Sequence, residues 1–333
     1  MTVKIKVCIL KKLQIIQVIF RTIIIISPPG LPVKADSTAH FLKGNTMQKI
    51  KISTDSTADI PREMWEELDI KVVPLTIVNG DRQYKDGYDL TPQEFYKILD
   101  ESAVLPSSSQ ATPVQFMELF EETWKQGYTH LIHTSINSKG SSTFQSAVQA
   151  RTFFFEEHPE AEKDFSITLI DSLTYSMCYG WPVIAAARMV KEGKSAEEIT
   201  EYIQEWVTHT RPMFVPLNLR CVKKSGRITP AAAFVGDALG LKPMITFEYG
   251  EAKIISKVRG EAKAIKALVE TCLKERKPGS PYQLVYGSNQ LQREKLREEL
   301  SKVMDQPPEF EYPVGCIIGI NTGPDMIGII YRT

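Results

Sequence analysis

The fold is decided by residues 129–170, which read THLIHTSINSKGSSTFQSAVQARTFFFEEHPEAEKDFSITLI. The run Thr129–Ile136 predicts a strand, Thr143–Glu157 predicts a helix, and Ile167–Ile170 predicts a second strand. Two parallel strands need a long connection between them, and a helix is the usual one. This stretch therefore predicts a parallel β-sheet whose faces are covered by helices.

The same alternation continues toward the N-terminus. Strands are predicted over Lys49–Ser53 and Val72–Val78. Asp59 and Pro61 predict the start of a helix with Asp59 as its N-cap, because Asp caps helix N-termini and Pro fits the first helical position. Further helices are predicted to begin at Thr91-Pro92 and Thr112-Pro113.

The pattern changes after about residue 180. Met244–Glu248 and Lys253–Val258 flank Tyr249-Gly250-Glu251 and predict a hairpin. Cys316–Ile320 and Ile327–Tyr331 predict two final strands. Hairpins mixed with helices indicate a mixed sheet, so we expect a second α/β domain. The remaining predicted helices lie at Trp181–Lys191, from the capping box of Ser195 and Glu198 onward, from Thr229-Pro230 to near Gly240, at Glu261–Arg276 and at Leu291–Met304. The remaining predicted strands lie at Met213–Asn218 and Tyr282–Tyr286.

Length and charge limit the possible functions. The chain has 333 residues, which suggests two domains, predicted at 47–175 and 176–333. Its 40 basic residues are balanced by 40 acidic ones, so binding to nucleic acid is not expected. Its 5 cysteines are scattered and form no C-x-x-C pair, which excludes a zinc ribbon and fits a reducing cytoplasm. No phosphate-binding G-x-x-x-x-G-K-[ST] and no G-x-G-x-x-G after a strand is present.

Residues 1–46 differ from the rest of the chain. They carry 7 basic residues and a single acid, Asp36, and an isoleucine-rich run at 13–26. The run is short for a membrane span and follows a basic stretch, as in a signal peptide, but a clear cleavage site is missing. We favour a translated leader with the natural start at Met47, and a weak signal-like segment is the alternative. In either case this segment is excluded from the predicted fold, and we expect a cytoplasmic protein.

Two loops are unusually rich in hydroxyl groups. One is Ser107-Ser108-Ser109-Gln110, and the other runs from Asn137 to Thr143. Both are expected to open at one edge of the parallel sheet, outside the carboxyl ends of its strands, where such sheets bind ligands. Helix N-termini there offer free N–H groups to an anion. Ser and Thr are also ordinary loop and N-cap residues, so a purely structural role stays open.

Other polar features have ordinary structural explanations. His130 and His133 are three residues apart in a predicted strand, so they point to opposite faces and a structural role is expected for both. The basic turn from Lys223 to Ile228 can be a solvated loop or can bind a partner or phosphate. Asn321-Thr322-Gly323-Pro324-Asp325 is expected to be a tight turn between two strands.

Several of these segments resemble motifs of the DegV family of bacterial lipid-binding proteins, from about Lys49 to Tyr331. They occur in the order that is typical of the family. Residues 54–61 resemble the opening motif T-D-S-T-A-D-L-P, and Ser108-Ser109-Gln110 resembles the T-S-Q motif. Residues 138–147 resemble S-x-L-S-G-T-Y-Q-S-A. Residues 224–228 resemble K-G-G-R-I, and residues 257–260 resemble K-x-R-G.

The resemblance implies two α/β domains with one long-chain fatty acid buried between them. It also implies a non-catalytic carrier that presents the fatty-acid carboxylate to a separate ATP-using kinase. Carried over by position, the carboxylate-binding residues are Ser108, Ser109, Ser141 and Asn321, and the kinase-docking residue is Arg227. No cofactor and no metal ion are expected, and membrane contact is at most transient.

Two departures from the family pattern matter most, and Ser142 in place of the glycine of S-G-T is a smaller one. Asn321 replaces a histidine, and Asp325 replaces a glycine. Asn can donate a hydrogen bond but does not titrate near neutral pH, and an aspartate close to the ligand carboxylate would repel it. Two alternatives therefore stay open: a hydrolase or acyltransferase with Ser109 or Ser141 as nucleophile, and a lipid-occupancy sensor without phosphoryl transfer.

Overall fold

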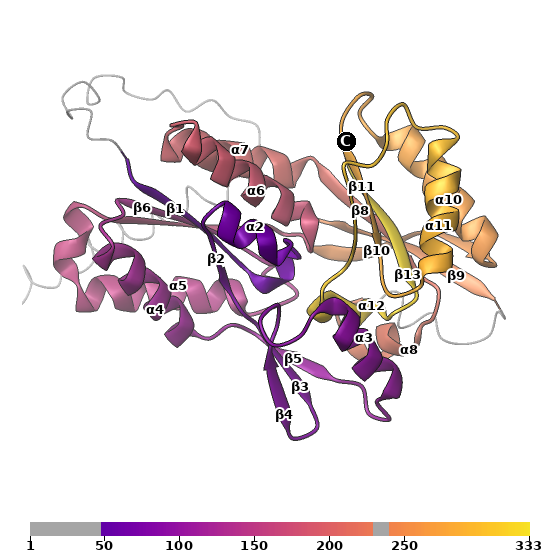
Figure 1. Cartoon of the computed structure of the whole chain (residues 1–333), viewed down its shortest axis with the longest axis horizontal. Helices are drawn as coiled ribbons and strands as arrows, with labels where there is room; N and C mark the ends of the chain where they lie inside the picture. The colour runs from indigo at the N-terminus through magenta and orange to yellow at the C-terminus, as the bar shows by residue number, and fades with distance from the viewer. Residues whose placement is uncertain (1–47, 229–239) are drawn as a thin grey trace, which may run out of the picture. The chain divides into compact units, whose positions relative to one another are not determined.

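The computed structural model describes residues 48–228 and 240–333, which form three β-sheets with helices packed around them (Figure 1). The predicted leader, residues 1–46, and nearly all of the short helix predicted from Thr229 lie outside the described residues. None of the helices that the structure describes has a stretch long and apolar enough to cross a lipid bilayer.

The first sheet is parallel, as predicted. Its strand order is β2-β1-β6-β7. Helices α4 and α5 pack together on one face, and α6 and α7 pack together on the other (Figure 1). The elements are β1 (Ile50–Asp55), β2 (Ile70–Val73), β6 (His130–Ser135), β7 (Ser166–Asp171), α2 (Arg62–Glu67), α4 (Pro113–Lys125), α5 (Thr143–Glu157), α6 (Met177–Lys191), α7 (Ala196–Thr208) and the short 3-10 helices η1 (Ser56–Ala58) and η2 (Pro159–Lys163).

The second sheet is mixed, also as predicted. Its order is β10-β9-β8-β13-β11-β12, and only β11 and β12 run parallel to each other. Helices α10 and α11 pack on it. The elements are β8 (Thr210–Pro216), β9 (Leu241–Glu248), β10 (Glu251–Arg259), β11 (Tyr282–Tyr286), β12 (Phe310–Pro313), β13 (Met326–Arg332), α8 (Arg220–Ser225), α10 (Glu261–Glu275), α11 (Gln290–Ser301) and α12 (Cys316–Thr322).

A third, antiparallel sheet was missed from the sequence. It contains β4 (Arg82–Lys85), β3 (Thr76–Asn79) and β5 (Ser107–Ser109), in that order, and α3 (Pro92–Glu101) follows β4 along the chain. The single strand predicted over Val72–Val78 is therefore wrong. Pro74 has no N–H to donate to a strand neighbour, so β2 ends before it and β3 begins in another sheet. The loop predicted at Ser107–Gln110 is wrong in the same way, because Ser107–Ser109 pair with β3.

Two other predictions at element ends are wrong. Cys316–Ile320 was expected to be a strand, and it lies in helix α12. A short apolar run that is buried on all sides has no periodicity that separates helix from strand. Asp59 was expected to cap a helix, but it ends η1 in the left-handed conformation at φ 55°, and α2 begins after Pro61.

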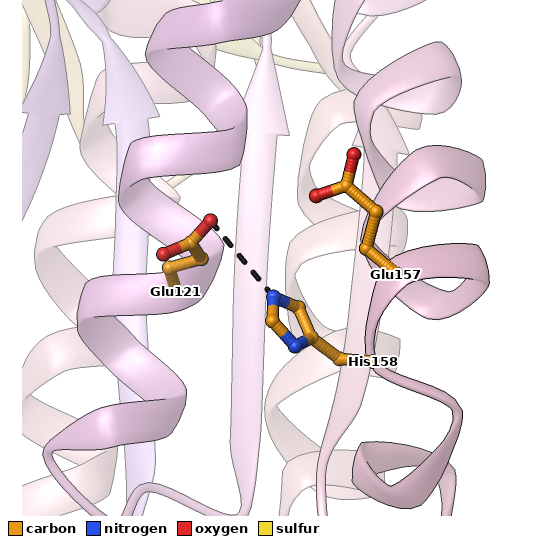
Figure 2. Close-up of side chains that lie close together, drawn as sticks. All are labelled: Glu121, Glu157 and His158. Atoms are coloured by element: carbon orange, nitrogen blue, oxygen red, sulfur yellow. Dashed lines mark ion pairs between the residues drawn. The ribbon is translucent and has the colours of Figure 1, made fainter.

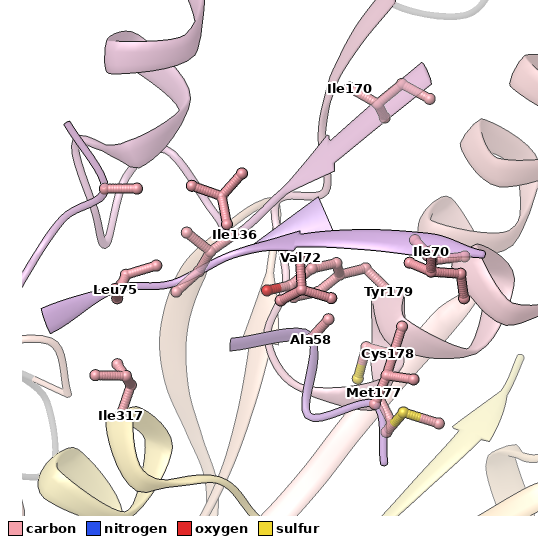
Figure 3. Packing of buried hydrophobic residues seen from close by; sticks show 14 of the residues in the cluster. Ala58, Ile70, Val72, Leu75, Ile136, Ile170, Met177, Cys178, Tyr179 and Ile317 are labelled. Carbon is pink, nitrogen blue, oxygen red and sulfur yellow. The ribbon is translucent and has the colours of Figure 1, made fainter. Parts of the chain in front are cut away.

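The hydrophobic core of the first sheet continues to the inner face of the second sheet. The same buried cluster contains residues of η1 and α6, such as Ala58 and Tyr179, together with Phe214 of β8. Leu75 and Ile317 belong to this cluster as well (Figure 3) and also line the cavity described below. A separate cluster lies between the second sheet and α10 and α11.

The predicted division into domains 47–175 and 176–333 stays a prediction. Residues Gln48–Thr333 form one compact unit by their contacts. Helix α6, which follows the predicted boundary, contacts both β1 of the first sheet and β8 of the second.

Candidate functional site

A cavity of about 590 Å³ lies between the first and second sheets, within the size range of small-molecule sites. Strand β5, the loop after β6, the segment before α6, the inner face of the second sheet and helix α12 all contribute to its wall. Since these segments are far apart in the sequence, the cavity is a product of the tertiary fold.

The four residues predicted to bind a carboxylate all line this cavity. Ser108 and Ser109 lie on β5, Ser141 precedes α5, and Asn321 lies in the last turn of α12. The structure therefore brings together residues from three segments that the sequence separates. Their role as carboxylate ligands stays a prediction.

Ser141 lies at the N-terminus of α5. Its hydroxyl oxygen is 2.9 Å from the Thr143 hydroxyl oxygen and accepts a hydrogen bond from the Thr143 backbone N–H at 3.3 Å. Ser142, the residue before α5, makes no side-chain capping bond to the helix. A ligand anion at Ser141 would therefore lie at a helix end whose first N–H groups favour negative charge.

Asn321 keeps donor capacity for a ligand. Its Nδ2 donates to the carbonyl of Ile317 at 2.7 Å. An amide nitrogen carries two hydrogens, so a second N–H can serve a ligand in the cavity. Asp325 does not line the cavity, and its Oδ1 accepts a hydrogen bond from Asn289 Nδ2 at 3.0 Å. The aspartate that replaces the family's glycine is thus directed to another partner, and the turn predicted between two strands instead joins α12 to β13.

Most of the remaining wall is apolar. Ile317 and Ile318 of α12 line the cavity together with Phe214 and Ile330 of the second sheet. A group of hydroxyl and amide donors beside an extended apolar wall suits a ligand with one polar end and a hydrocarbon body.

Arg227 lies at the cavity and is exposed. It follows the end of α8, where Gly226 adopts a left-handed φ of 66°. Its Nη1 donates to the Ser225 carbonyl at 2.9 Å, and its Nε donates to the Gly140 carbonyl at 3.4 Å. The second contact connects α8 to the loop that carries Ser141.

Sequence reasoning missed several cavity residues. Tyr175 and Ser176 line the cavity just before α6, and Gly250 and Glu251 at the β9–β10 turn line it from the second sheet. The Lys139 ammonium pairs with Glu251 across these segments at 2.9 Å. No local sequence signal identifies such residues, because only the fold brings their segments together.

The histidines of the described chain offer no base for a serine nucleophile. None of the four lines the cavity. His133 Nδ1 is 2.9 Å from the Ser53 hydroxyl in the core, and burial lowers the pKa of His133 to about 3. His130 Nδ1 is 2.8 Å from the Thr129 hydroxyl. These contacts support the structural roles expected for His130 and His133.

One group of potential metal ligands lies away from the cavity. Ligand atoms of Glu121, Glu157 and His158 lie within 4.8 Å of one another between α4 and the end of α5 (Figure 2). His158 Nε2 is 3.9 Å from a Glu121 oxygen, and Lys125 Nζ contacts the same carboxylate. Because Lys125 already neutralises Glu121, this group is explained as an ion-pair cluster. The prediction that the protein holds no metal stays untested.

Three aspartates, the buried Asp55 and Asp86 and the partly buried Asp59, lie close enough to influence one another. Burial raises the pKa of Asp55, raises that of Asp59 to about 8 and raises that of Asp86 to about 6. Asp55 accepts hydrogen bonds from the Ile136 backbone N–H and the Tyr179 hydroxyl, both at 2.7 Å. Asp55 therefore ties the C-terminal ends of neighbouring strands to α6.

Comparison with known proteins identifies sequences and structures that are similar to this chain. A family described as "Uncharacterised protein, DegV family" matches residues 49–333. A DegV domain-containing protein of Caldanaerobacter subterraneus subsp. tengcongensis is 35% identical over 292 residues, covering 86% of this chain and 99% of that protein. A DegV family protein of Thermus thermophilus, described for its fatty acid binding, is 28% identical with a TM-score of 0.75 and coverage of 86% of this chain and 100% of that chain. The Streptococcus pneumoniae fatty acid kinase (Fak) B3 protein, loaded with linoleic acid, shares the fold at 22% identity with a TM-score of 0.73, covering 86% of this chain and 99% of that chain.

Proposed function

The chain belongs to the DegV family, and we propose that it is a carrier that binds one long-chain fatty acid in the cavity between its two larger sheets and presents the carboxylate to a partner kinase. The observation that carries this proposal is the meeting of Ser108, Ser109, Ser141 and Asn321 at a cavity whose remaining wall is largely apolar. The fatty-acid binding described for the Thermus thermophilus protein supports the same ligand class.

The binding energy would come mainly from the hydrocarbon tail. Burying one methylene group is worth about 0.8 kcal/mol. A long acyl chain therefore binds tightly without a strong clamp on its carboxylate. Neutral hydroxyl and amide groups are sufficient donors for the polar end.

The choice of donors suits a carboxylate that must react. A bidentate arginine would occupy both carboxylate oxygens, whereas single hydrogen bonds from serines leave an oxygen lone pair available. In the proposed reaction that oxygen attacks the terminal phosphorus of ATP held by the kinase, which yields the acyl phosphate and ADP.

The kinase partner rests on the resemblance of the motifs to the family and on the name of the pneumococcal protein of the same fold. Arg227 is our proposed docking residue, because it is exposed beside the cavity and a kinase must approach the carboxylate there. In the described part of the chain, the Arg227 guanidinium donates to the backbone carbonyls of Ser225 and Gly140, which favours docking over the alternative of an arginine held by a buried acid.

Extraction of the purified protein tests the ligand. We expect solvent extraction of protein made in bacteria, followed by mass spectrometry, to yield about one acyl chain per protein chain. Protein that carries no lipid and does not bind a fluorescent fatty acid would overturn the proposed function.

One observation favours a second function, that of a lipid-occupancy sensor. Asn321 stands where the family has a histidine, and its amide does not titrate near neutral pH. The discriminating experiment incubates the loaded protein with a bacterial fatty-acid kinase and ATP. Acyl-phosphate formation supports the carrier, and bound lipid without turnover supports the sensor. A hydrolase is disfavoured, because the described histidines lie away from Ser109 and Ser141.

A further inference from the structure

Asp59 connects three segments that meet beside the cavity. It directly follows η1, and its Oδ2 accepts a hydrogen bond from the Ser176 hydroxyl at 2.5 Å. The Gly315 backbone N–H, at the start of α12, also favours the charged form of Asp59. One carboxyl group thus contacts both the segment before α6 and Gly315, the N-cap residue of α12.

Ser176 needs such a partner to keep its conformation. It lines the cavity and adopts φ 56° and ψ −146°, a region that residues with side chains rarely occupy. Strained residues persist only where surrounding contacts hold them. The hydrogen bond to Asp59 is such a contact, so Asp59 supports the shape of the cavity wall at Ser176.

The approach of Asp59 to α12 depends on the glycine at 315. A Cβ atom at Gly315 would lie 2.2 Å from Asp59 Oδ1, so only glycine allows this contact without displacement. The Cys316 thiol next to it favours the charged form of Asp86. Two carboxyl groups therefore hold the beginning of α12, a helix of 7 residues that ends with Asn321 and Thr322 in the cavity wall.

We propose that Asp59 is a positioning residue for the carboxylate-binding end of the cavity, holding Ser176 and the start of α12 together so that Asn321 is fixed relative to Ser141. This inference rests on the proposed function, since it assumes a ligand carboxylate at that end. Asp59 itself does not line the cavity. It acts on the ligand only through the residues that it holds.

Ionisation of Asp59 would strengthen its hydrogen bonds with Ser176 and Gly315, but it would also place a negative charge close to an anionic ligand. The titratable groups that influence Asp59 or are influenced by it come from the elements packed around it, and they are Asp55, Asp86, Tyr96, Cys178, Tyr179, Tyr312 and Cys316. None of these groups is cationic. A negative charge on Asp59 would therefore have hydrogen-bond donors but no cationic partner among these groups, and from behind Ser176 it would repel a carboxylate.

The experiment compares affinities for a fatty acid and for its methyl ester at pH 7. Wild-type protein is expected to prefer the acid. Asp59→Ala should reduce affinity for the acid about tenfold while changing affinity for the ester much less, because the ester does not use the carboxylate-binding donors fully. Asp59→Asn keeps an oxygen acceptor and should retain most of the preference at pH 7. Equal losses for acid and ester in Asp59→Ala would mean a general structural role and would overturn the inference.

The pH profile is the second readout. Wild-type affinity for the acid should fall between pH 7 and pH 9 as Asp59 ionises, and Asp59→Asn should lose this fall. Identical profiles would also overturn the inference. The matched control is Asp69→Ala, because Asp69 has the same left-handed backbone, at φ 56°, and bonds Lys51 and Tyr128 away from the cavity.

Two further variants cover the case in which Asp59→Ala does not fold. Ser176→Ala removes the hydroxyl that Asp59 holds, and Gly315→Ala forces the carboxyl away from α12. Both should lower the preference for acid over ester, and an unchanged preference in both would overturn the inference. Wild-type protein that binds neither compound would instead contradict the proposed function itself.

Discussion

Ser141 is the residue through which the carboxylate contact can be tested most directly. Losing one neutral hydrogen bond costs about 0.5–1.5 kcal/mol. Ser141→Ala should therefore weaken fatty-acid binding only between about two- and twelvefold, and acyl-phosphate formation with a kinase should fall further. A displacement titration and a single-turnover assay measure the two effects. Unchanged binding and turnover in the Ser108/Ser109/Ser141 triple Ala variant would contradict this assignment.

Arg227 tests docking of the kinase. An exposed arginine at an interface can supply a large share of the binding energy. Arg227→Ala should change fatty-acid affinity little, because the arginine's contacts are to backbone carbonyls, and should reduce acyl-phosphate formation about tenfold. When the kinase is titrated at a fixed concentration of loaded carrier, Arg227→Ala should raise the kinase concentration that gives half-maximal acyl-phosphate formation.

The control for Arg227 is Lys295→Ala. Lys295 is exposed on α11, which packs on the second sheet away from the cavity, and the substitution removes the same charge. It should leave turnover unchanged. A large drop in melting temperature for Arg227→Ala, with a proportional loss of lipid binding, would instead make Arg227 a structural residue.

At the scale of elements, α12 forms a wall of the proposed acyl site. Ile318 lies one turn before Asn321 and lines the cavity. Ile318→Phe should fill part of the volume and shift the preference from 18-carbon toward 12-carbon acids, as measured by competition between the two. Leu291→Phe, an exposed position on α11, is the control. A chain-length preference that stays the same in Ile318→Phe would place the tail elsewhere.

Elements with local signals were predictable from the sequence. Thr91, Thr112 and Ser195 form capping boxes in the structure, and the helices that they begin were predicted. These signals are local because a cap bonds residues three positions away. The parallel first sheet was predictable because the alternation of strands and helices can be recognised along the sequence.

Elements and residues that depend on distant partners were not predictable. Helix α12 and strand β5 acquire their form from neighbours such as α3 and β3. Asp59 and Ser176, separated by 117 positions, meet only in the folded chain. Ser108, Ser109, Ser141 and Asn321 were identified through the family resemblance, because serines in loops are too common to indicate a site by themselves.

At the scale of the whole molecule, buried carboxyl groups make stability depend on pH. Asp59 has its pKa raised to about 8, so the folded state retains a proton that the unfolded chain has already released. That contribution to stability is complete below the ordinary pKa near 4 and is lost as the pH rises through 8. The melting temperature should therefore fall between pH 7 and pH 8.5, and Asp59→Asn should flatten this slope.

His133 makes the stability of the fold depend on pH in the opposite direction. Burial lowers the pKa of His133 to about 3, so its neutral form stabilises the fold above pH 6.5 and that contribution declines as the pH falls. The raised pKa values of Asp59 and Asp86 oppose this effect below pH 6.5, so calorimetry across pH 5 to 9 should show the clearest change as a fall between pH 6.5 and pH 8, where His133 no longer contributes. A melting temperature that rises steadily toward pH 9 would contradict the buried state of Asp59.

Binding of one acyl chain per cavity, as proposed above, would give the protein a fixed capacity for lipid. Each copy would remove one detergent-like molecule from solution, so the number of protein copies would set the largest amount of lipid that can be held. When supply exceeds that number, the free concentration rises sharply, and when it is lower the free concentration stays near the dissociation constant. Expression level would then set a threshold for fatty acid, in the way that the amount of a chelator sets the threshold for a metal ion.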